Sequence, residues 1–174
     1  MEISPSFSIT NVRNLSGADV DESASVTKPP TFQNRRKSLY FEAKILDANR
    51  QKNKGISIGS DDQTVVCLMD EGVILSPNGI IPLGNELFQV GDIIGCRVLL
   101  DIYKSGSQDY HHVIFSSNGV EIGYPVIFEG NPPISVGIVQ DDKYEGAPIN
   151  EMVNLNFGDR PFQHSFGNYT LFPQ

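Results

Sequence analysis

One five-residue stretch has the spacing of a catalytic serine. Residues 55 to 59 read Gly-Ile-Ser-Ile-Gly and match the G-x-S-x-G pattern of the nucleophile elbow in serine hydrolases. That elbow needs a strand, a strained turn and then a helix, with an acid and a histidine following along the chain. Here the stretch itself has the pattern of a strand, and a polar segment with a further β-type run takes the place of the helix. We therefore interpret Ser57 as a strand serine and expect no enzyme activity.

Two groups of residues have side chains that could bind a metal ion. His111 and His112 are adjacent, so in a strand their rings point to opposite faces and do not share one ion. Two acidic pairs could supply calcium ligands if their loops meet: Asp61, Asp62, Asp141 and Asp142. Calcium takes about six to eight oxygen ligands, and neither loop has the spacing of a known calcium loop. We expect an acidic rim in solvent, with no metal and no cofactor.

The composition is that of one ordinary globular domain with many turns. The chain has 174 residues, of which 39% are hydrophobic and 20% are charged, and it contains 16 glycines and 11 prolines. A chain of this length can bury a stable core without disulfides or metals. Its formal net charge of -8 disfavours nucleic acid and anionic membranes as partners, because binding to phosphates relies on lysine and arginine.

Both cysteines, Cys67 and Cys96, lie inside apolar runs, where a free thiol packs as a small hydrophobic group. Their placement indicates no disulfide framework. The N-terminal Met-Glu-Ile-Ser-Pro lacks the pattern of a secretory signal, and no apolar stretch has membrane-spanning length. We expect a protein of the cytoplasm or nucleus.

Short apolar runs that alternate with polar residues predict an all-β protein. The clearest run extends from 93 to 102, where every second residue is apolar from Ile94 onward, after an acidic turn at Gly91-Asp92. Asn118-Gly119 is the strongest short signal for a β-hairpin. Further strands are predicted at residues 39 to 45, 56 to 59, 65 to 69, 73 to 75, 111 to 115, 120 to 122, 134 to 138 and 152 to 157, with a polar loop at 103 to 109.

The first 36 residues are the least regular part, with a possible short strand at 7 to 10. After them, residues 39 to 46 and 55 to 60 could form an antiparallel hairpin through a polar turn at 48 to 54. In that case the loop before Leu39 and the loop after Ser60 would lie at the same end of the domain.

Seven segments, in order, resemble motifs of the SPRY domain family. They are Leu39-Tyr-Phe-Glu-Ala-Lys-Ile45 (family "YYFEV"), Gly55-Ile-Ser-Ile-Gly59 ("IG"), Asp70-Glu-Gly72 ("DDG"), Val90-Gly-Asp-Ile-Ile-Gly-Cys96 ("GD-x-I-G-C"), Val113-Ile-Phe-Ser-Ser-Asn-Gly-Val120 ("FxxNG"), Ile134-Ser-Val-Gly137 ("PAVG") and Val153-Asn-Leu-Asn-Phe-Gly-Asp-Arg-Pro-Phe162 ("VxxNFGxxPF").

The resemblance implies a bent two-layer antiparallel β-sandwich of the concanavalin-A-like kind, over residues 37 to 174, after an N-terminal extension at 1 to 36. It also implies a protein-interaction module whose loops hold a short peptide, as in RanBPM-type scaffolds of ubiquitin ligases. The chain departs from the family at 65 to 69, where Val-Val-Cys-Leu-Met replaces an aromatic segment, and it has no tryptophan. The specific partner of a relative is therefore not transferred.

The family topology adds the loop at 140 to 150 to the proposed binding end. The candidate partner-binding residues are then Pro30, Arg35, Arg36, Asp61, Asp62, Asp141, Lys143 and Tyr144. Arginine and tyrosine are the residues that most often contribute interface energy. We expect a monomer that binds a short extended segment of another protein. The alternative is a lectin-like carbohydrate-binding module, although these loops offer few aromatic residues beyond Phe32 and Tyr144 for stacking on sugars.

Overall fold

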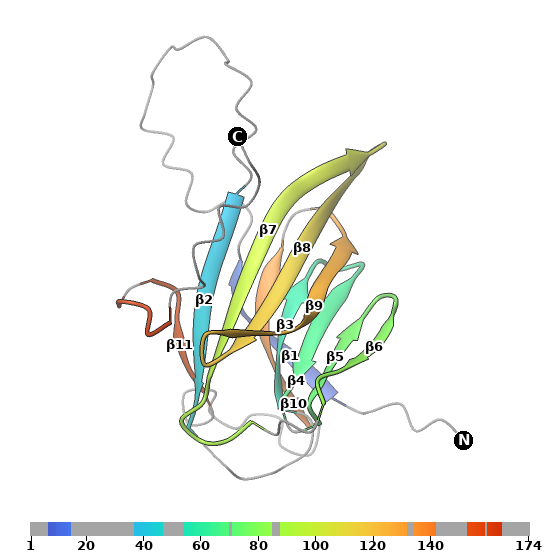
Figure 1. Cartoon of the computed structure of the whole chain (residues 1–174). Coiled ribbons are helices and arrows are strands. Elements are labelled where there is room, and N and C mark those ends of the chain that lie inside the picture. Colours follow the sequence, from blue (N-terminus) through green and yellow to red (C-terminus); the bar gives the residue numbers. More distant parts are fainter. Residues whose placement is uncertain are drawn as a thin grey trace, which may run out of the picture.

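The computed structural model describes residues 7–14, 37–46, 54–69, 71–84, 88–131, 134–141, 153–158 and 160–164. Eleven strands occur within these ranges (Figure 1). They are β1 (Phe7–Asn14), β2 (Lys37–Ile45), β3 (Gly55–Gly59), β4 (Thr64–Leu68), β5 (Val73–Ser76), β6 (Gly79–Pro82), β7 (Ile93–Ser105), β8 (Gln108–Ser117), β9 (Val120–Glu129), β10 (Ser135–Asp141) and β11 (Val153–Asn156).

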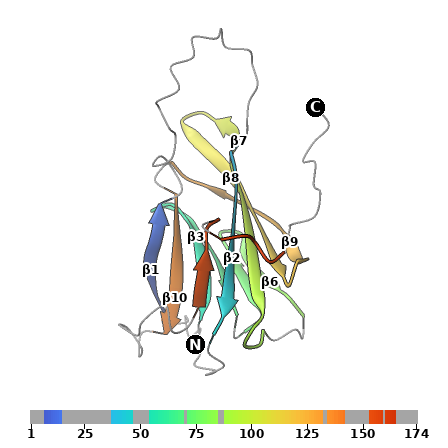
Figure 2. The ribbon, with the colours of Figure 1, turned by 90° about the vertical axis from the view of Figure 1, so that its left-hand side faces the viewer.

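The strands form two antiparallel sheets that face each other. The six-stranded sheet has the order β1-β10-β3-β4-β5-β6, and the five-stranded sheet has the order β11-β2-β7-β8-β9. Figure 2 shows β1 beside β10 at one side of the sandwich. The predicted all-β, two-layer antiparallel sandwich is confirmed.

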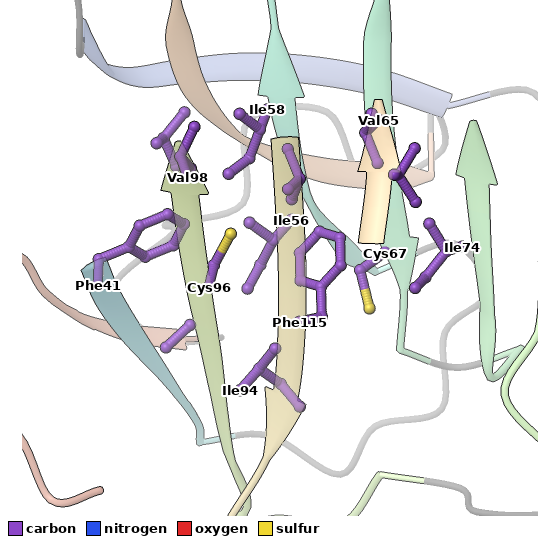
Figure 3. Close-up of a cluster of buried hydrophobic side chains, with 14 of the residues drawn as sticks. Phe41, Ile56, Ile58, Val65, Cys67, Ile74, Ile94, Cys96, Val98 and Phe115 are labelled. Atoms are coloured by element: carbon purple, nitrogen blue, oxygen red, sulfur yellow. The ribbon is translucent and has the colours of Figure 1, made fainter. Parts of the chain in front are cut away.

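The core lies between the two sheets and follows from the alternation of side chains along each strand. Phe41, Cys96 and Phe115 come from the five-stranded sheet and meet Ile56 and Cys67 of the six-stranded sheet (Figure 3). All five side chains are buried. Since burying one such large apolar side chain stabilises a fold by about 1.5–3 kcal/mol, this layer supplies the main driving force for folding.

Strand β7 has the face that its sequence predicts. Ile94, Cys96, Val98 and Leu100 all belong to the core cluster. On the opposite face, the side chain of Ser116 packs directly against Gly95. A Cβ at this position would overlap the Ser116 hydroxyl, so the strand needs glycine here. The strand that carries the most distinctive motif of the chain is therefore structural.

Two predicted connections were wrong. Strand β2 does not form a hairpin with β3, because its two edges are paired with β7 and β11 in the five-stranded sheet, whereas β3 lies between β10 and β4 in the other sheet. The alternation of side chains shows which face of a strand is buried, but not which strand it pairs with. The predicted polar loop at 103 to 109 is instead a tight turn at Gly106, with Ser105 paired to Gln108.

The start of the chain contributes to the sandwich. The strand expected at 7 to 10 extends over Phe7–Asn14 and pairs with β10 at the edge of the six-stranded sheet. This part of the expected N-terminal extension is therefore hydrogen-bonded to the domain. The division of the chain at residue 36 stays a prediction.

Candidate functional site

The turn that joins β3 to β4 carries two of the candidate residues. Asp61 and Asp62 are exposed at its tip. The amide of Ser60 donates to the carbonyl of Gln63 at 2.9 Å, and the Ser60 hydroxyl accepts from the amides of Asp62 (3.2 Å) and Gln63 (3.3 Å). A serine hydroxyl that bonds amides two and three residues ahead closes a turn tightly. These hydrogen bonds fix the backbone that carries the two carboxylates. Residues 60 to 63 are called the Ser60–Gln63 turn below.

The side chain of Gln63 ties this turn to the opposite sheet. Its Nε2 donates to Glu129 Oε1 at 3.1 Å, and its Oε1 accepts from the backbone amide of Glu129 at 2.9 Å. Glu129 ends β9, which belongs to the five-stranded sheet. Two reciprocal bonds from one side chain therefore fix the relative position of the two sheets at this end.

Gly130 lies directly beneath the turn. A Cβ at this position would overlap the Ser60 hydroxyl, so the close approach requires glycine. Its amide donates to the carbonyl of Asp109 at 3.1 Å, and its carbonyl accepts from Nε2 of the buried His111 at 2.8 Å. His111 also packs against Phe128, with ring centroids 5.0 Å apart. This histidine therefore supports the turn from below.

The pair His111 and His112 has the expected geometry. His111 is buried, whereas His112, on the other face of β8, is half-buried. Adjacent strand residues point to opposite faces, so the two rings do not meet at one ion.

The start of β2 lies at the same end as the Ser60–Gln63 turn. Lys37 pairs with Leu100 of β7, and a few residues further along β7 Tyr103 pairs with Tyr110, which in turn pairs with Glu129. The expectation that the chain enters β2 at the end where β3 terminates is therefore confirmed, although the hairpin from which it was inferred does not exist.

Asp141 lies at the opposite end of the six-stranded sheet, which corrects the expected surface. The first residue of β10, Ser135, pairs with Gly59 next to the turn, and Asp141 ends the strand opposite Phe7. Six residues of extended strand span about 20 Å. The grouping of Asp61 and Asp62 with Asp141 was wrong, because the Ser60–Gln63 turn and the last residue of β10 lie at opposite ends of the sheet.

Five candidate residues lie outside the described ranges: Pro30, Arg35, Arg36, Lys143 and Tyr144. Whether they bind a partner stays a prediction. Of the expected binding surface, the structure therefore describes the turn with Asp61 and Asp62 and the start of β2.

Ser57 lies in the middle of β3 and is buried, paired with Val66 on one side and Gly137 on the other. Its neighbours Ile56 and Ile58 point into the core. The G-x-S-x-G stretch is therefore regular strand, as interpreted from the sequence, and has no elbow at the serine. Within the part of the chain that the structure describes, no helix is long and apolar enough to cross a membrane.

Two surface features were missed from the sequence. One is a small polar pocket of about 110 Å³ beside β2 and β11, lined by residues that include Glu42, Lys44 and Arg160. The other is a groove of about 270 Å³ between β6 and β9, lined by residues that include Ile80 and Tyr124. The dipeptide Asn78-Gly79, a hairpin signal like Asn118-Gly119, could have revealed β6 and with it the groove.

No protein-family model matches the chain, and no curated protein matches it. Among solved structures, the chain is similar to a human SPRY domain known from its crystal structure, with 17% sequence identity and a TM-score of 0.45. The match covers 71% of this chain and 78% of the human domain. The order of the seven sequence motifs resembles the same family.

Proposed function

We propose that this chain is a non-enzymatic protein-interaction module. In this proposal it binds a short extended segment of a partner protein at the end of the sandwich where the Ser60–Gln63 turn and the start of β2 lie. The observation that carries the proposal is the turn itself, in which the carboxylates of Asp61 and Asp62 are exposed on a fixed backbone. Three hydrogen bonds within the turn, two hydrogen bonds between Gln63 and Glu129, and the close approach of Gly130 to Ser60 hold this backbone. The seven motifs that resemble the SPRY family support the same class of function.

A rigid turn favours binding because little conformational entropy is lost when the partner docks. Exposed carboxylates attract lysine and arginine, and a net charge of -8 draws a basic segment toward the surface over a longer distance. We therefore propose that the bound segment is basic where it meets Asp61 and Asp62.

The wider setting is proposed from the family resemblance alone. We place the chain in the cytoplasm or nucleus, as a monomer that recognises substrates within a ubiquitin ligase or a similar scaffold. The free, buried thiols of Cys67 and Cys96 are compatible with a reducing compartment.

The test uses short synthetic peptides built from glycine and serine, with clusters of lysine, serine or glutamate and no apolar residue. Fluorescence anisotropy measures the Kd of each peptide for the wild-type chain. We expect the lysine peptides to bind best. The double substitution Asp61→Asn and Asp62→Asn should weaken binding by about tenfold, the loss expected for contacts worth ~1.4 kcal/mol together.

The matched control is the double substitution Glu71→Gln and Glu121→Gln, which removes two other exposed carboxylates away from the turn. It should leave the Kd of the lysine peptides within about twofold, because these peptides have no apolar residue to bind in the groove beside Glu71 and Glu121, and separated surface charges alone interact weakly in salt. If both double variants lost the same affinity for the lysine peptides, binding would depend on the net charge of the chain and not on the turn. Calcium-dependent binding of glycans in place of peptides would support the lectin-like alternative instead.

A further inference from the structure

The groove between β6 and β9 exposes large apolar side chains. The strands β6 and β9 are the last members of their respective sheets and lie on the same side of the sandwich (Figure 1). The groove between them therefore lies at an edge of both sheets. Ile80 is 69% exposed, Tyr124 is 61% exposed and Ile127 is 39% exposed. All three line the same groove. Single exposed apolar residues are common on protein surfaces, but a cluster around a hollow marks an interaction surface.

A β-bulge presents Tyr124 to solvent. Val113 of β8 pairs with Val126 of β9, and the next pair joins Phe115 to Ile122, so β9 carries extra residues between the two pairs. Gly123 lies in this bulge with φ of 67°, a conformation that favours glycine. Bulges commonly redirect a side chain at the edge of a sheet, and here the redirected side chain is a tyrosine.

The bulge is packed against the six-stranded sheet and is therefore well supported. A Cβ at Gly123 would lie 3.1 Å from Leu83 Cδ2 and 3.2 Å from Ile74 Cδ1. Because the backbone at this point contacts the opposite sheet so closely, Tyr124 starts from a fixed position. Tyrosines in fixed positions are frequent anchors of binding energy.

The lining of the groove determines the chemistry of its ligand. It consists of apolar residues, glycine and the neutral polar residues Ser76 and Asn78, with no charged side chain among them. A volume of about 270 Å³ accommodates one or two apolar side chains. Pro125 has no amide hydrogen to donate, so this part of β9 favours side-chain docking over the addition of a whole strand.

Charge lies beside one end of the groove. Leu83, which follows β6, lies next to Gly123 of β9 at this end of the groove. The amide of Leu83 donates to the carbonyl of Gly72 at 2.8 Å, and Glu71 directly precedes Gly72, so Glu71 is near the same end. Glu121 precedes Gly123 by two residues, and both glutamates are exposed. A second copy of a chain with a net charge of -8 would bring more negative charge to this edge. A partner with positive charge is complementary to it.

We propose that the groove between β6 and β9 is a second docking surface, for an extended segment of another protein that carries an aliphatic or aromatic side chain next to lysine or arginine. The apolar side chain enters the groove between Ile80 and Tyr124. The basic residue faces Glu71 and Glu121. This surface shares no lining residue with the Ser60–Gln63 turn. The proposal can therefore be tested independently of the function proposed above.

The experiment uses synthetic peptides with a central Leu-Ser-Phe, flanked on one side by two lysines, two serines or two glutamates. Isothermal titration calorimetry measures the Kd, and amide chemical shifts locate the binding site. We expect the lysine-flanked peptide to bind best, with shifts confined to β6, β9 and their neighbours. Ile80→Asp and Tyr124→Ala should each weaken it by about 30-fold, the loss typical of an interface anchor.

Three variants separate the possible outcomes. Glu71→Gln with Glu121→Gln should remove the preference for lysine and leave binding of the serine-flanked peptide unchanged. Asp61→Asn with Asp62→Asn should leave the Kd of the serine-flanked peptide unchanged, whereas a large loss there would assign binding to the turn. Because Ile80 is largely exposed, Ile80→Asp should unfold at the wild-type temperature. An unchanged unfolding temperature would show that the weaker affinity of this variant comes from the groove and not from misfolding.

Two results would overturn the proposal. One is equal binding of all three peptides to the wild type and to Ile80→Asp. The other is a wild-type dimer in sedimentation equilibrium that Ile80→Asp dissociates, because the groove would then be the contact between copies of this chain.

Discussion

At the scale of single residues, Glu42 shows what alternation cannot predict. It occupies the polar phase of β2, which would place it in solvent, yet it is only 3% exposed. Its Oε1 accepts from the amide of His164 at 2.8 Å and from the hydroxyl of Tyr40 at 3.2 Å, and its Oε2 accepts from the amide of Gln163 at 2.9 Å. The two amide donors come from a segment more than a hundred residues later in the chain. Glu42 therefore holds the end of the described chain against the five-stranded sheet.

We expect Glu42→Gln to destabilise the protein by about 1–3 kcal/mol. The glutamine side chain has one uncharged acceptor oxygen where glutamate has two charged ones, and its NH2 group would face a backbone N–H that needs an acceptor. Urea unfolding followed by circular dichroism measures the change. Glu121→Gln, at an exposed position, is the control and should change stability by less than about 0.5 kcal/mol. If both variants unfolded at the same urea concentration, the hydrogen bonds of Glu42 would be energetically neutral.

At the scale of elements, the Asn118-Gly119 turn joins local and distant interactions. Asn118 has φ of 48° and Gly119 has φ of 83°, the positive values of a tight hairpin turn. Asn118 Oδ1 accepts from the amide of Ile93 at 2.9 Å, and its Nδ2 donates to Asp92 Oδ1 at 2.9 Å. The turn thereby fixes the start of β7 as well as joining β8 to β9.

The turn at Gly106 provides a matched comparison. Gly106 also has positive φ, at 64°, but a Cβ there would meet no atom within 4 Å. A Cβ at Gly119 would lie 3.1 Å from His164 Nδ1. Alanine at either position pays the strain of positive φ, about 1–2 kcal/mol. We expect Gly119→Ala to cost more than Gly106→Ala in thermal unfolding. Equal costs would mean that His164 moves aside freely.

The strands themselves were largely predictable, because each buried face repeats every second residue. Their pairing was not. The strands β2 and β3 are consecutive but lie in different sheets, and β1 pairs with β10 across most of the chain. Pairing depends on which edges remain open after all other strands have found partners, and no local pattern records that.

At the scale of the whole molecule, the two buried thiols couple stability to pH. Burial raises the pKa of Cys67 from an ordinary value of 9.0 to about 12, and burial together with the nearby Cys67 raises the pKa of Cys96. In the unfolded chain both thiols ionise near pH 9. A raised pKa in the folded state gives stability that is fully present below the unfolded value and is lost as pH rises from about 9 toward 12.

We therefore expect the free energy of unfolding to fall above pH 9, by up to ~1.4 kcal/mol per thiol and pH unit. Urea unfolding on either side of pH 9 measures this slope. The double variant Cys67→Ala and Cys96→Ala is less stable at every pH, because it leaves small cavities, but its slope should be shallower. A slope that is the same in both proteins would contradict the assignment to the thiols. Neither native thiol should react with a thiol reagent below pH 9, since both are buried.

The charge and the open edge of the sandwich also act at this scale. A net charge of -8 favours basic partners at exposed acidic positions. Among the described residues, exposed acidic side chains lie at the Ser60–Gln63 turn and, as Glu71 and Glu121, beside the groove between β6 and β9. The proposals differ in what else the partner must carry: the turn requires only positive charge, and the groove also requires an apolar side chain.

The sequence by itself determined the class of fold, the core faces of the strands, the hairpin at Asn118-Gly119 and the structural nature of Ser57, because these depend on residues within a few positions of each other. Only the tertiary structure decided that the turn with Asp61 and Asp62 and the residue Asp141 lie at opposite ends of the six-stranded sheet, that Glu42 is buried, and that Ile80 and Tyr124 share one groove. Each of these facts depends on which strands pair and in which register, and strand pairing joins residues that are distant in the chain.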